Sequence, residues 1–371
     1  MPFKRAVAND DESPASPQIS LYELALRWQG DSENHLRESD FVFGLIGGRK
    51  LLEDVAMIRL ILVLVLAFLS SGLAAAQPLK EIRIGSSNIS YTNFSTFYAR
   101  DRKFFEKEGL SPKIIVIKTE AALPAMATGQ LDYTTLTTST IEAALMGMPL
   151  RLVAVANQQP LWGVVAGKGI TRVADLKNKT LGVSSYGGAA YGAALAVLKA
   201  YGLEPKKDVA ILATGDNMSR IAALKHGSVD AALIAAPGDI KVAEEGYRIL
   251  LDAGTIYKLP MGGVSASLAK IQGNRDEVRK VVGAVVRASK FIIDPQNKED
   301  VVNYIGTFFK LDRGAAVEFY QRIVPSLSST GIVDRDKIKL VIDSAIERGL
   351  TDKPLDPDAV TDFSMARQLR P

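Results

Sequence analysis

The chain has no cysteine and only two histidines among its 371 residues. The lack of cysteine excludes disulfide bonds, thiolate metal sites and cysteine nucleophiles. His35 lies in a segment set aside below, and His226 precedes a glycine at an expected helix end, where it favours the helix dipole without any catalytic role. No G-x-G-x-x-G or G-x-x-x-x-G-K-[ST] motif occurs. We therefore expect a protein that is not an enzyme, without catalytic residues, metal or cofactor.

Extremes of composition and charge are also missing. Apolar residues make up 47% and charged residues 23%, with 30 glycines and 16 prolines. These values are typical of globular proteins and exclude disordered, collagen-like and multispanning membrane chains. The formal net charge of +4 is too small to indicate nucleic-acid binding. The length predicts two domains.

No apolar run in the N-terminal region reaches the roughly 20 residues of a membrane span. Met57-Ile58-Arg59, the apolar residues 60–69 and Ala74-Ala75-Ala76 instead have the order of a secretory signal peptide, predicted over 57–76. Residues 1–56 carry ten acidic and six basic residues and show no sustained apolar periodicity. We interpret them as a disordered, non-native upstream extension of the reading frame. The alternative is a cytoplasmic tail on a membrane anchor.

The chain after residue 76 alternates short β-branched runs with helical segments that end at glycines. This order predicts an α/β fold with mostly parallel sheets and flanking helices. The pattern starts again near residue 181, and Asp132 corresponds to Asp230 at an offset of 98 residues. We therefore expect two similar lobes. Asp132 and Asp230, at equivalent places, are expected to have a structural capping role.

The lobe boundaries follow from this repeat. We predict lobe 1 over residues 77–160 and 267–371 and lobe 2 over residues 161–266. The extended segments 161–167 and 262–268 flank the second lobe, and we expect them to form a two-stranded hinge. From residue 275 onward the pattern is helical, and these helices are expected to pack on lobe 1 because no further strands remain.

Several phrases resemble the nitrate/sulfonate/taurine-type substrate-binding proteins of ABC importers, a family related to thiamine-pyrimidine-precursor binding proteins. They are, in order, IRIG, FYARDRKFFEKEGL, ATGQLDYTTLTTSTIEAALMGMPLRLVA, VADLKNKTLGVSSYGG and ALKHGSVDAALIAAP. The resemblance implies a periplasmic-binding-protein fold of the type II-like class, with two lobes that close on a ligand. It also implies a membrane permease and ATPase in the inner membrane as partners. The signal peptide predicts export to the periplasm, and we expect a monomer. Members of this family take up sulfonates, nitrate, carboxylates, aromatic acids and thiamine precursors, so the ligand stays open.

Ligands of open α/β sheets lie beyond the carboxyl ends of the strands. The loops expected there contain the candidate ligand-binding residues Ser87, Asn88, Tyr91, Thr137, Thr138, Ser139, Ser185, Tyr186, Gly187, Gly188, Ala189 and Ala236. Ser185 and the two glycines precede a long Ala-rich helix, whose N-terminus favours an anion. Thr137-Thr138-Ser139 repeats this arrangement in the other lobe. The alternative is that these residues only begin helices.

Other side chains give weaker signals. Phe94 is expected in the core, while Trp162 fits either a hinge contact or a cleft wall. Arg220 and Lys118 could complement an anion, but we expect both at the surface. Two functional alternatives remain: an enzyme of the same fold from a menaquinone or thiamine-precursor pathway, and a secreted or tethered sensor domain. The signal peptide favours the importer over a cytoplasmic enzyme, and the sensor domain stays open.

Overall fold

The computed structural model describes residues 78–87, 89–186 and 188–369, together with residues 55, 57–59, 61 and 62. Residues Gln77–Pro371 form one compact unit, separate from Met1–Ala76. Apart from the few residues just given, the predicted extension and signal peptide lie outside the described residues, as do Asn88 and Gly187. In the described part, no helix has both the length and the apolar character needed to cross a membrane.

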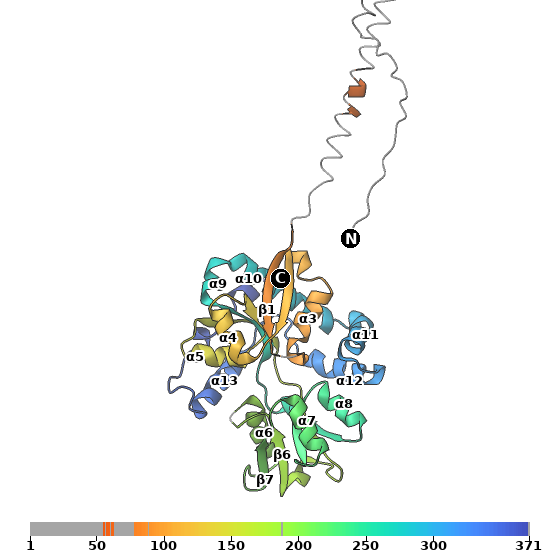
Figure 1. Ribbon diagram of the computed structural model, residues 1–371, viewed down its shortest axis with the longest axis vertical. Helices are drawn as coiled ribbons and strands as arrows, with labels where there is room; N and C mark the ends of the chain where they lie inside the picture. The colour runs from red at the N-terminus through yellow and green to blue at the C-terminus, as the bar shows by residue number, and fades with distance from the viewer. Residues whose placement is uncertain are drawn as a thin grey trace, which may run out of the picture. The chain divides into compact units, whose positions relative to one another are not determined.

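The described strands form two mixed sheets of five strands each (Figure 1). The first sheet has the order β2-β1-β3-β10-β4, and the second has the order β7-β6-β8-β5-β9. The strands are β1 (Lys80–Ser86), β2 (Leu110–Val116), β3 (Tyr133–Thr134), β4 (Leu150–Asn157), β5 (Trp162–Ala166), β6 (Lys179–Val183), β7 (Val209–Ala213), β8 (Ala231–Ala235), β9 (Arg248–Asp252) and β10 (Met261–Ser267). In each sheet four strands run one way, and β10 or β5 runs against them. The predicted α/β class with mostly parallel sheets is confirmed.

The segments between the strands are helical, as the periodicity predicts. The first lobe, built on the first sheet, contains η1 (Tyr91–Asn93), α3 (Phe94–Asp101), η2 (Glu106–Glu108), α4 (Thr119–Ala127) and α5 (Thr138–Leu145). The second lobe, built on the second sheet, contains η3 (Val173–Leu176), α6 (Ala189–Ala200), α7 (Asn217–Lys225), α8 (Gly238–Glu244) and η4 (Ala253–Thr255). The helices α4, α5, α7 and α8 each follow a strand and begin within a few residues of that strand's carboxyl end.

Asp132 and Asp230 occupy equivalent places, as the 98-residue offset predicts. Asp132 accepts a hydrogen bond from the backbone N–H of Arg83 in β1, at 2.8 Å. Asp230 accepts one from the backbone N–H of Thr180 in β6, also at 2.8 Å. Each aspartate thus links the start of one strand to the strand beside it, so the expected structural role fits both residues.

The predicted two-stranded hinge is wrong. β5 pairs with β8 and β9 in the second sheet, whereas β10 pairs with β3 and β4 in the first. The chain leaves the first sheet after β4 at residue 157 and re-enters it with β10 at residue 261. The return to the first lobe therefore comes before β10, not at the boundary near residue 266 that the sequence predicts. β10 is buried among neighbours of its own sheet, which accounts for its apolar, extended sequence.

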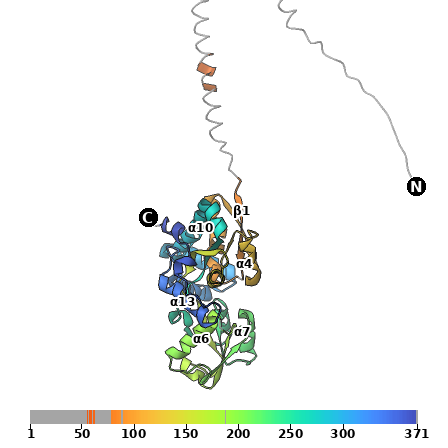
Figure 2. The ribbon, with the colours of Figure 1, turned by 90° about the vertical axis from the view of Figure 1, so that its left-hand side faces the viewer.

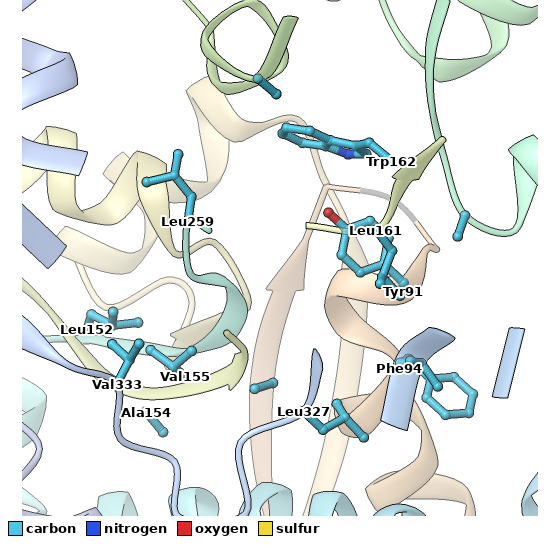
Figure 3. Close-up of a cluster of buried hydrophobic side chains, with 14 of the residues drawn as sticks. Tyr91, Phe94, Leu152, Ala154, Val155, Leu161, Trp162, Leu259, Leu327 and Val333 are labelled. Atoms are coloured by element: carbon cyan, nitrogen blue, oxygen red, sulfur yellow. The ribbon is translucent and has the colours of Figure 1, made fainter. Parts of the chain in front are cut away.

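The C-terminal helices pack on the first lobe, as expected (Figures 1 and 2). They are α9 (Leu268–Gly273), α10 (Arg275–Ile293), η5 (Pro295–Asn297), α11 (Lys298–Phe309), α12 (Arg313–Ile323), η6 (Val324–Ser326), α13 (Arg335–Glu347), η7 (Pro357–Ala359) and α14 (Ser364–Arg367). Phe94 of α3 is fully buried and stacks on Phe309 of α11, with ring centres 5.7 Å apart. The core placement expected of Phe94 is thus found (Figure 3).

Candidate functional site

A cavity of about 880 Å³ lies between the two lobes. Its walls include the carboxyl ends of β3 and β8 and the start of β5. The residues lining it from the first lobe and the C-terminal helices are Ser87, Ile89, Ser90, Tyr91, Thr92, Thr119, Thr135, Leu136, Thr137, Thr138, Ser139, Met261, Gly262, Phe308, Phe309 and Lys310. Those from the second lobe are Trp162, Asp216, Asn217, Met218, Arg220, Ile221, Lys225, Ala235, Ala236, Pro237, Gly238, Lys241, Val242 and Glu245.

Four helices have their first residue in this lining. They are α4 and α5 from the first lobe and α7 and α8 from the second, beginning at Thr119, Thr138, Asn217 and Gly238. The start of a helix carries partial positive charge and backbone N–H groups without a partner inside the helix. The walls therefore present several partial positive charges to one space, which favours a negatively charged occupant.

On the first-lobe side, hydroxyl groups gather between the ends of β1 and β3. The strand order changes direction here, because β2 lies on one side of β1 and β3 on the other. Ser86 accepts hydrogen bonds from the Asn93 amide at 2.7 Å and from the Thr135 hydroxyl at 3.3 Å. Thr137 is buried, and its hydroxyl oxygen has no hydrogen-bond partner within the described part of the chain. Because Thr135 and Thr137 both line the cavity, this side offers hydroxyl groups to an occupant.

On the second-lobe side, Arg220 of α7 lies beside β8. Its side chain is 6% exposed. Nε donates to the Leu233 carbonyl at 2.5 Å, and Nη1 donates to the Gly215 carbonyl at 2.8 Å. Nη2 donates to the side-chain oxygen of Asn217 at 3.1 Å. These bonds hold the guanidinium between the end of β8 and the start of α7.

Burial lowers the pKa of Arg220 to about 10, so the group is still protonated at neutral pH. Within the described residues Arg220 forms no ion pair with a carboxylate. Asp216 opposes the lowering of this pKa, but its carboxylate is exposed and already caps α7 by accepting from the Ser219 N–H at 2.8 Å. The cavity thus contains a buried positive charge that is only weakly compensated.

Aromatic side chains also contribute to the wall, namely Tyr91, Trp162, Phe308 and Phe309. Trp162 starts β5 directly opposite Ala235 of β8, and its side chain is 7% exposed. Tyr91 from the first lobe is buried, and burial raises the pKa of its hydroxyl. Figure 3 shows Tyr91, Leu161 and Trp162 in one cluster where the two lobes meet. Trp162 is therefore placed at a cleft wall, one of the two positions considered from the sequence.

The other cations of the lining have partners or are open to solvent. Lys225 pairs with Glu245 at 2.5 Å. Lys241 of α8 donates to the Phe309 carbonyl at 2.8 Å and so links the second lobe to α11. Lys310 is exposed. Arg220 therefore differs from these three lysines, because it is both buried and without a carboxylate partner.

The structure brings about half of the predicted site residues together. The residues found in the cavity wall are Ser87, Tyr91, Thr137, Thr138, Ser139 and Ala236. Ser185, Tyr186, Gly188 and Ala189 are not in that wall. Asn88 and Gly187 lie outside the described residues. The second-lobe wall comes from α7 and α8 rather than from the loop before α6.

The surface position that the sequence analysis expects for Arg220 is wrong, because this side chain is buried in the cavity wall. A signal for burial was present. Arg220, Ile221 and Leu224 share one face of α7, and that face is buried against the sheet. An arginine on an apolar helix face, just after a strand, indicates a buried cation.

Comparison with known proteins defines the class of this fold. The chain superposes on the periplasmic aliphatic sulphonate binding protein SsuA from Escherichia coli with a TM-score of 0.62. The two chains are 18% identical, and the superposition covers 76% of this chain and 92% of SsuA. The periplasmic nitrate-binding protein NrtA from Synechocystis gives a TM-score of 0.63 and 15% identity, covering 78% and 88%. The chain thus has the two-lobed periplasmic-binding-protein fold of such ABC substrate-binding proteins, as the resemblance predicts.

The sequence itself places the chain in a family. The model of the NMT1/THI5 like family matches residues 91–298, more than half of the chain, and the chain belongs to this family. The riboflavin-binding protein RibY of Chloroflexus aurantiacus is 27% identical over 222 residues, or 57% of this chain. The match spans 62% of RibY, less than two thirds of its length.

Proposed function

We propose that this protein is the extracytoplasmic solute-binding component of an ABC importer. It captures a small organic anion between its two lobes and delivers it to a membrane permease. The observation that carries the proposal is the cavity of about 880 Å³, which has a buried, weakly compensated Arg220 on one side and hydroxyl groups on the other. No chemical step is needed, because the site holds a solute by charge, hydrogen bonds and aromatic surface.

The size of the cavity favours an organic solute. Pockets for small organic molecules span roughly 300–1,000 Å³, and the cavity lies in the upper part of that range. An inorganic anion such as nitrate would leave most of this volume filled by water. The names of the similar proteins refer to riboflavin, aliphatic sulphonates and nitrate. An organic acid or a ring-containing solute fits the size and the aromatic wall better than nitrate does.

The predicted signal peptide at residues 57–76 supports export. The construction of the fold supports capture by closure, because the chain crosses between the lobes through two short segments, before β5 and before β10. A solute that contacts both lobes stabilises the form in which they lie close together. A permease can then recognise the loaded protein.

A thermal-shift screen of the full chain tests the binding function. The panel contains riboflavin, alkanesulfonates, nitrate, aromatic acids, short carboxylates and thiamine precursors. A solute with a Kd of ~1 μM at 100-fold excess should add about 2.7 kcal/mol to the free energy of unfolding. Small-angle scattering with the solute that binds should show a smaller radius of gyration.

The matched control is Thr138→Trp, which puts a large ring at the start of α5 in the cavity wall. This variant should keep the unliganded melting temperature and lose the ligand-induced shift. The same shift in both proteins would place the binding elsewhere. A panel without any shift would contradict the binding function.

Export has its own test, because it depends on the N-terminal segment. N-terminal sequencing of the protein from the periplasm should find a start at or near Gln77. An intact chain from Met1 in the membrane fraction would instead support the alternative of a membrane anchor.

A further inference from the structure

Arg220 is held in an orientation that leaves part of its guanidinium available. Arginine has five N–H donors. Three of them have partners, which are the carbonyls of Leu233 and Gly215 and the side chain of Asn217. Two remain without a partner among the described residues, on a side chain that belongs to the cavity wall. One N–H on each of Nη1 and Nη2 is therefore left to donate, and a guanidinium commonly binds oxygens of a carboxylate or a sulfonate through such groups.

The bonds around Asn217 show that this orientation is built into the fold. The Asn217 side-chain oxygen also accepts from the backbone N–H of Ala235 at 2.7 Å. One amide side chain thus connects Arg220 to the end of β8. Ala235 lies opposite Trp162 of β5 in the second sheet, and Arg220 and Trp162 both line the cavity. The charge and the ring are therefore held by neighbouring strands.

A buried charge without a partner of opposite charge is costly. Arg220 has carbonyl and amide oxygens around it, which stabilise the cation only through partial charges. A purely structural role, in which Arg220 ties the loop before α7 to β8, would need only its three existing bonds. It would not explain why a permanently charged side chain, with two donors left over, forms part of the wall of a ligand-sized cavity.

We propose that Arg220 determines the specificity of this site, and that the solute is an aromatic oxyacid whose acid group binds Arg220 while its ring lies against Trp162. This inference deepens the proposed function and depends on it. It names the solute class as a carboxylate or sulfonate attached to a planar ring. An uncharged ring compound lacks the contact with Arg220, and a small inorganic anion lacks the contact with Trp162.

Matched pairs of acids and their amides test the inference. The probes are benzoate with benzamide and benzenesulfonate with benzenesulfonamide, measured by calorimetry on the full chain. Losing a hydrogen bond to a charged group costs about tenfold to a hundredfold in affinity. The parent should therefore bind at least one acid tenfold or more tighter than its amide. In Arg220→Gln this ratio should fall to about one, while the affinity for the amide stays within about threefold.

Two further variants separate charge from structure. Arg220→Lys keeps the cation and should retain part of the preference for the acid. Lys199→Gln removes an exposed cation of the second lobe outside the cavity wall and should change the ratio less than threefold, because solvent screens its charge. Circular dichroism and melting temperatures show whether each variant is folded. If Arg220→Gln does not fold, the test instead compares the acid-to-amide affinity ratio of Arg220→Lys with that of the parent.

Each outcome has a defined meaning. Equal binding of acids and amides by the parent, or an equal loss of both in Arg220→Gln, would overturn the role of Arg220. No binding of any of the four probes would overturn the aromatic-acid class. In these cases the wider solute panel still tests the proposed function separately. That panel contains solutes without a ring, such as alkanesulfonates and nitrate, and an uncharged solute, riboflavin.

Discussion

Arg322 of α12 forms a buried ion pair with Asp239 of α8, at 2.7 Å. The same guanidinium group pairs with Asp252, the last residue of β9, at 2.9 Å. Asp239 is completely buried and also accepts from the backbone N–H of Gly163 at 3.0 Å. The pair therefore joins the C-terminal helices to the second lobe. Asp239 is the second residue of α8, so the pair also holds the start of this helix, whose first residue, Gly238, lines the cavity.

Arg322→Gln should destabilise the protein in a pH-dependent way. Burial raises the pKa of Asp239 to about 6, and the Arg322 guanidinium opposes that rise. Without the guanidinium this pKa rises further, so ionised Asp239 becomes costly. Stability linked to a raised carboxyl pKa is present at low pH and is lost as the pH rises through that pKa. The loss in free energy of unfolding should be about 3–5 kcal/mol at pH 8 and smaller at pH 5.

Urea denaturation of the parent and the variant at both pH values measures this difference. The matched control is Arg313→Gln, which breaks an exposed pair with Glu299 on the same stretch of helices. The control should lose less than about 1 kcal/mol at either pH. A loss from Arg322→Gln that is the same at pH 5 and pH 8 would show that Asp239 does not titrate in this range.

Gly262→Ala should disturb the floor of the cavity. Gly262 has a φ of +63°, and an added Cβ would lie 1.7 Å from the Thr92 carbonyl oxygen. The backbone around η1 and Tyr91 must then move. The free energy of unfolding should therefore fall by about 1–3 kcal/mol, and the affinity for the solute should fall as well. Gly273→Ala is the control, because a Cβ there meets nothing within 4 Å and its φ is ordinary. Melting temperature and calorimetry measure the two effects. Unchanged binding by a folded Gly262→Ala variant would contradict this prediction.

Asp132→Asn should cost more stability than Asp230→Asn at neutral pH. Burial alone would raise the pKa of Asp132, but hydrogen bonds from Arg83 and Lys270 outweigh it and hold the pKa below the usual value. Lys270 Nζ lies 2.9 Å from Asp132 Oδ1, whereas Lys179 Nζ lies 3.9 Å from Asp230 Oδ1. We expect about 1–3 kcal/mol for Asp132→Asn.

The pH dependence follows from the sign of this shift. Stability linked to a lowered carboxyl pKa is present above the ordinary pKa and is lost as the pH falls through the lowered value. The difference between Asp132→Asn and the parent should therefore shrink between pH 7 and pH 3 in denaturant titrations. A difference that grows towards pH 3 would contradict the lowered pKa.

Ser139→Ala and Ser185→Ala distinguish the observed cavity from the site predicted at the start of α6. Ser139 lines the cavity, and Ser185 does not. With the solute found by screening, Ser139→Ala should weaken binding about threefold to tenfold, which corresponds to a net hydrogen bond of about 0.5–1.5 kcal/mol. Ser185→Ala should leave the affinity unchanged in the same calorimetric titration. A larger loss for Ser185→Ala would mean that the loop before α6 joins the site in the bound state.

The order of the elements could be predicted from the sequence because it depends on local periodicity. The helix α10 begins at Arg275, where the helical pattern is predicted to start, because its apolar face repeats over several turns. The offset between Asp132 and Asp230 identified the two sheets as repeats of one arrangement. The resemblance of the quoted phrases identified the fold. These features depend on residues that are close together in the sequence.

The cavity depends on packing between segments that are far apart in the sequence. The residue types at Ser185 and at Thr138 both suit a helix start, and nothing local shows that only the second faces the cavity. In the same way, β5 and β10 are both extended and apolar, but their partners are chosen by the sheets in which they lie, so the predicted hinge between them does not form.

The sequence by itself determined which segments are strands and helices, and that the chain repeats one α/β arrangement, since these properties come from neighbours within a few residues. The tertiary structure alone decided that Arg220 is buried beside the end of β8 and that Arg322 reaches Asp239 across 83 residues. The physical reason is that the energy of a charge depends on which groups surround it. Those groups come together only when the two sheets and the C-terminal helices have packed.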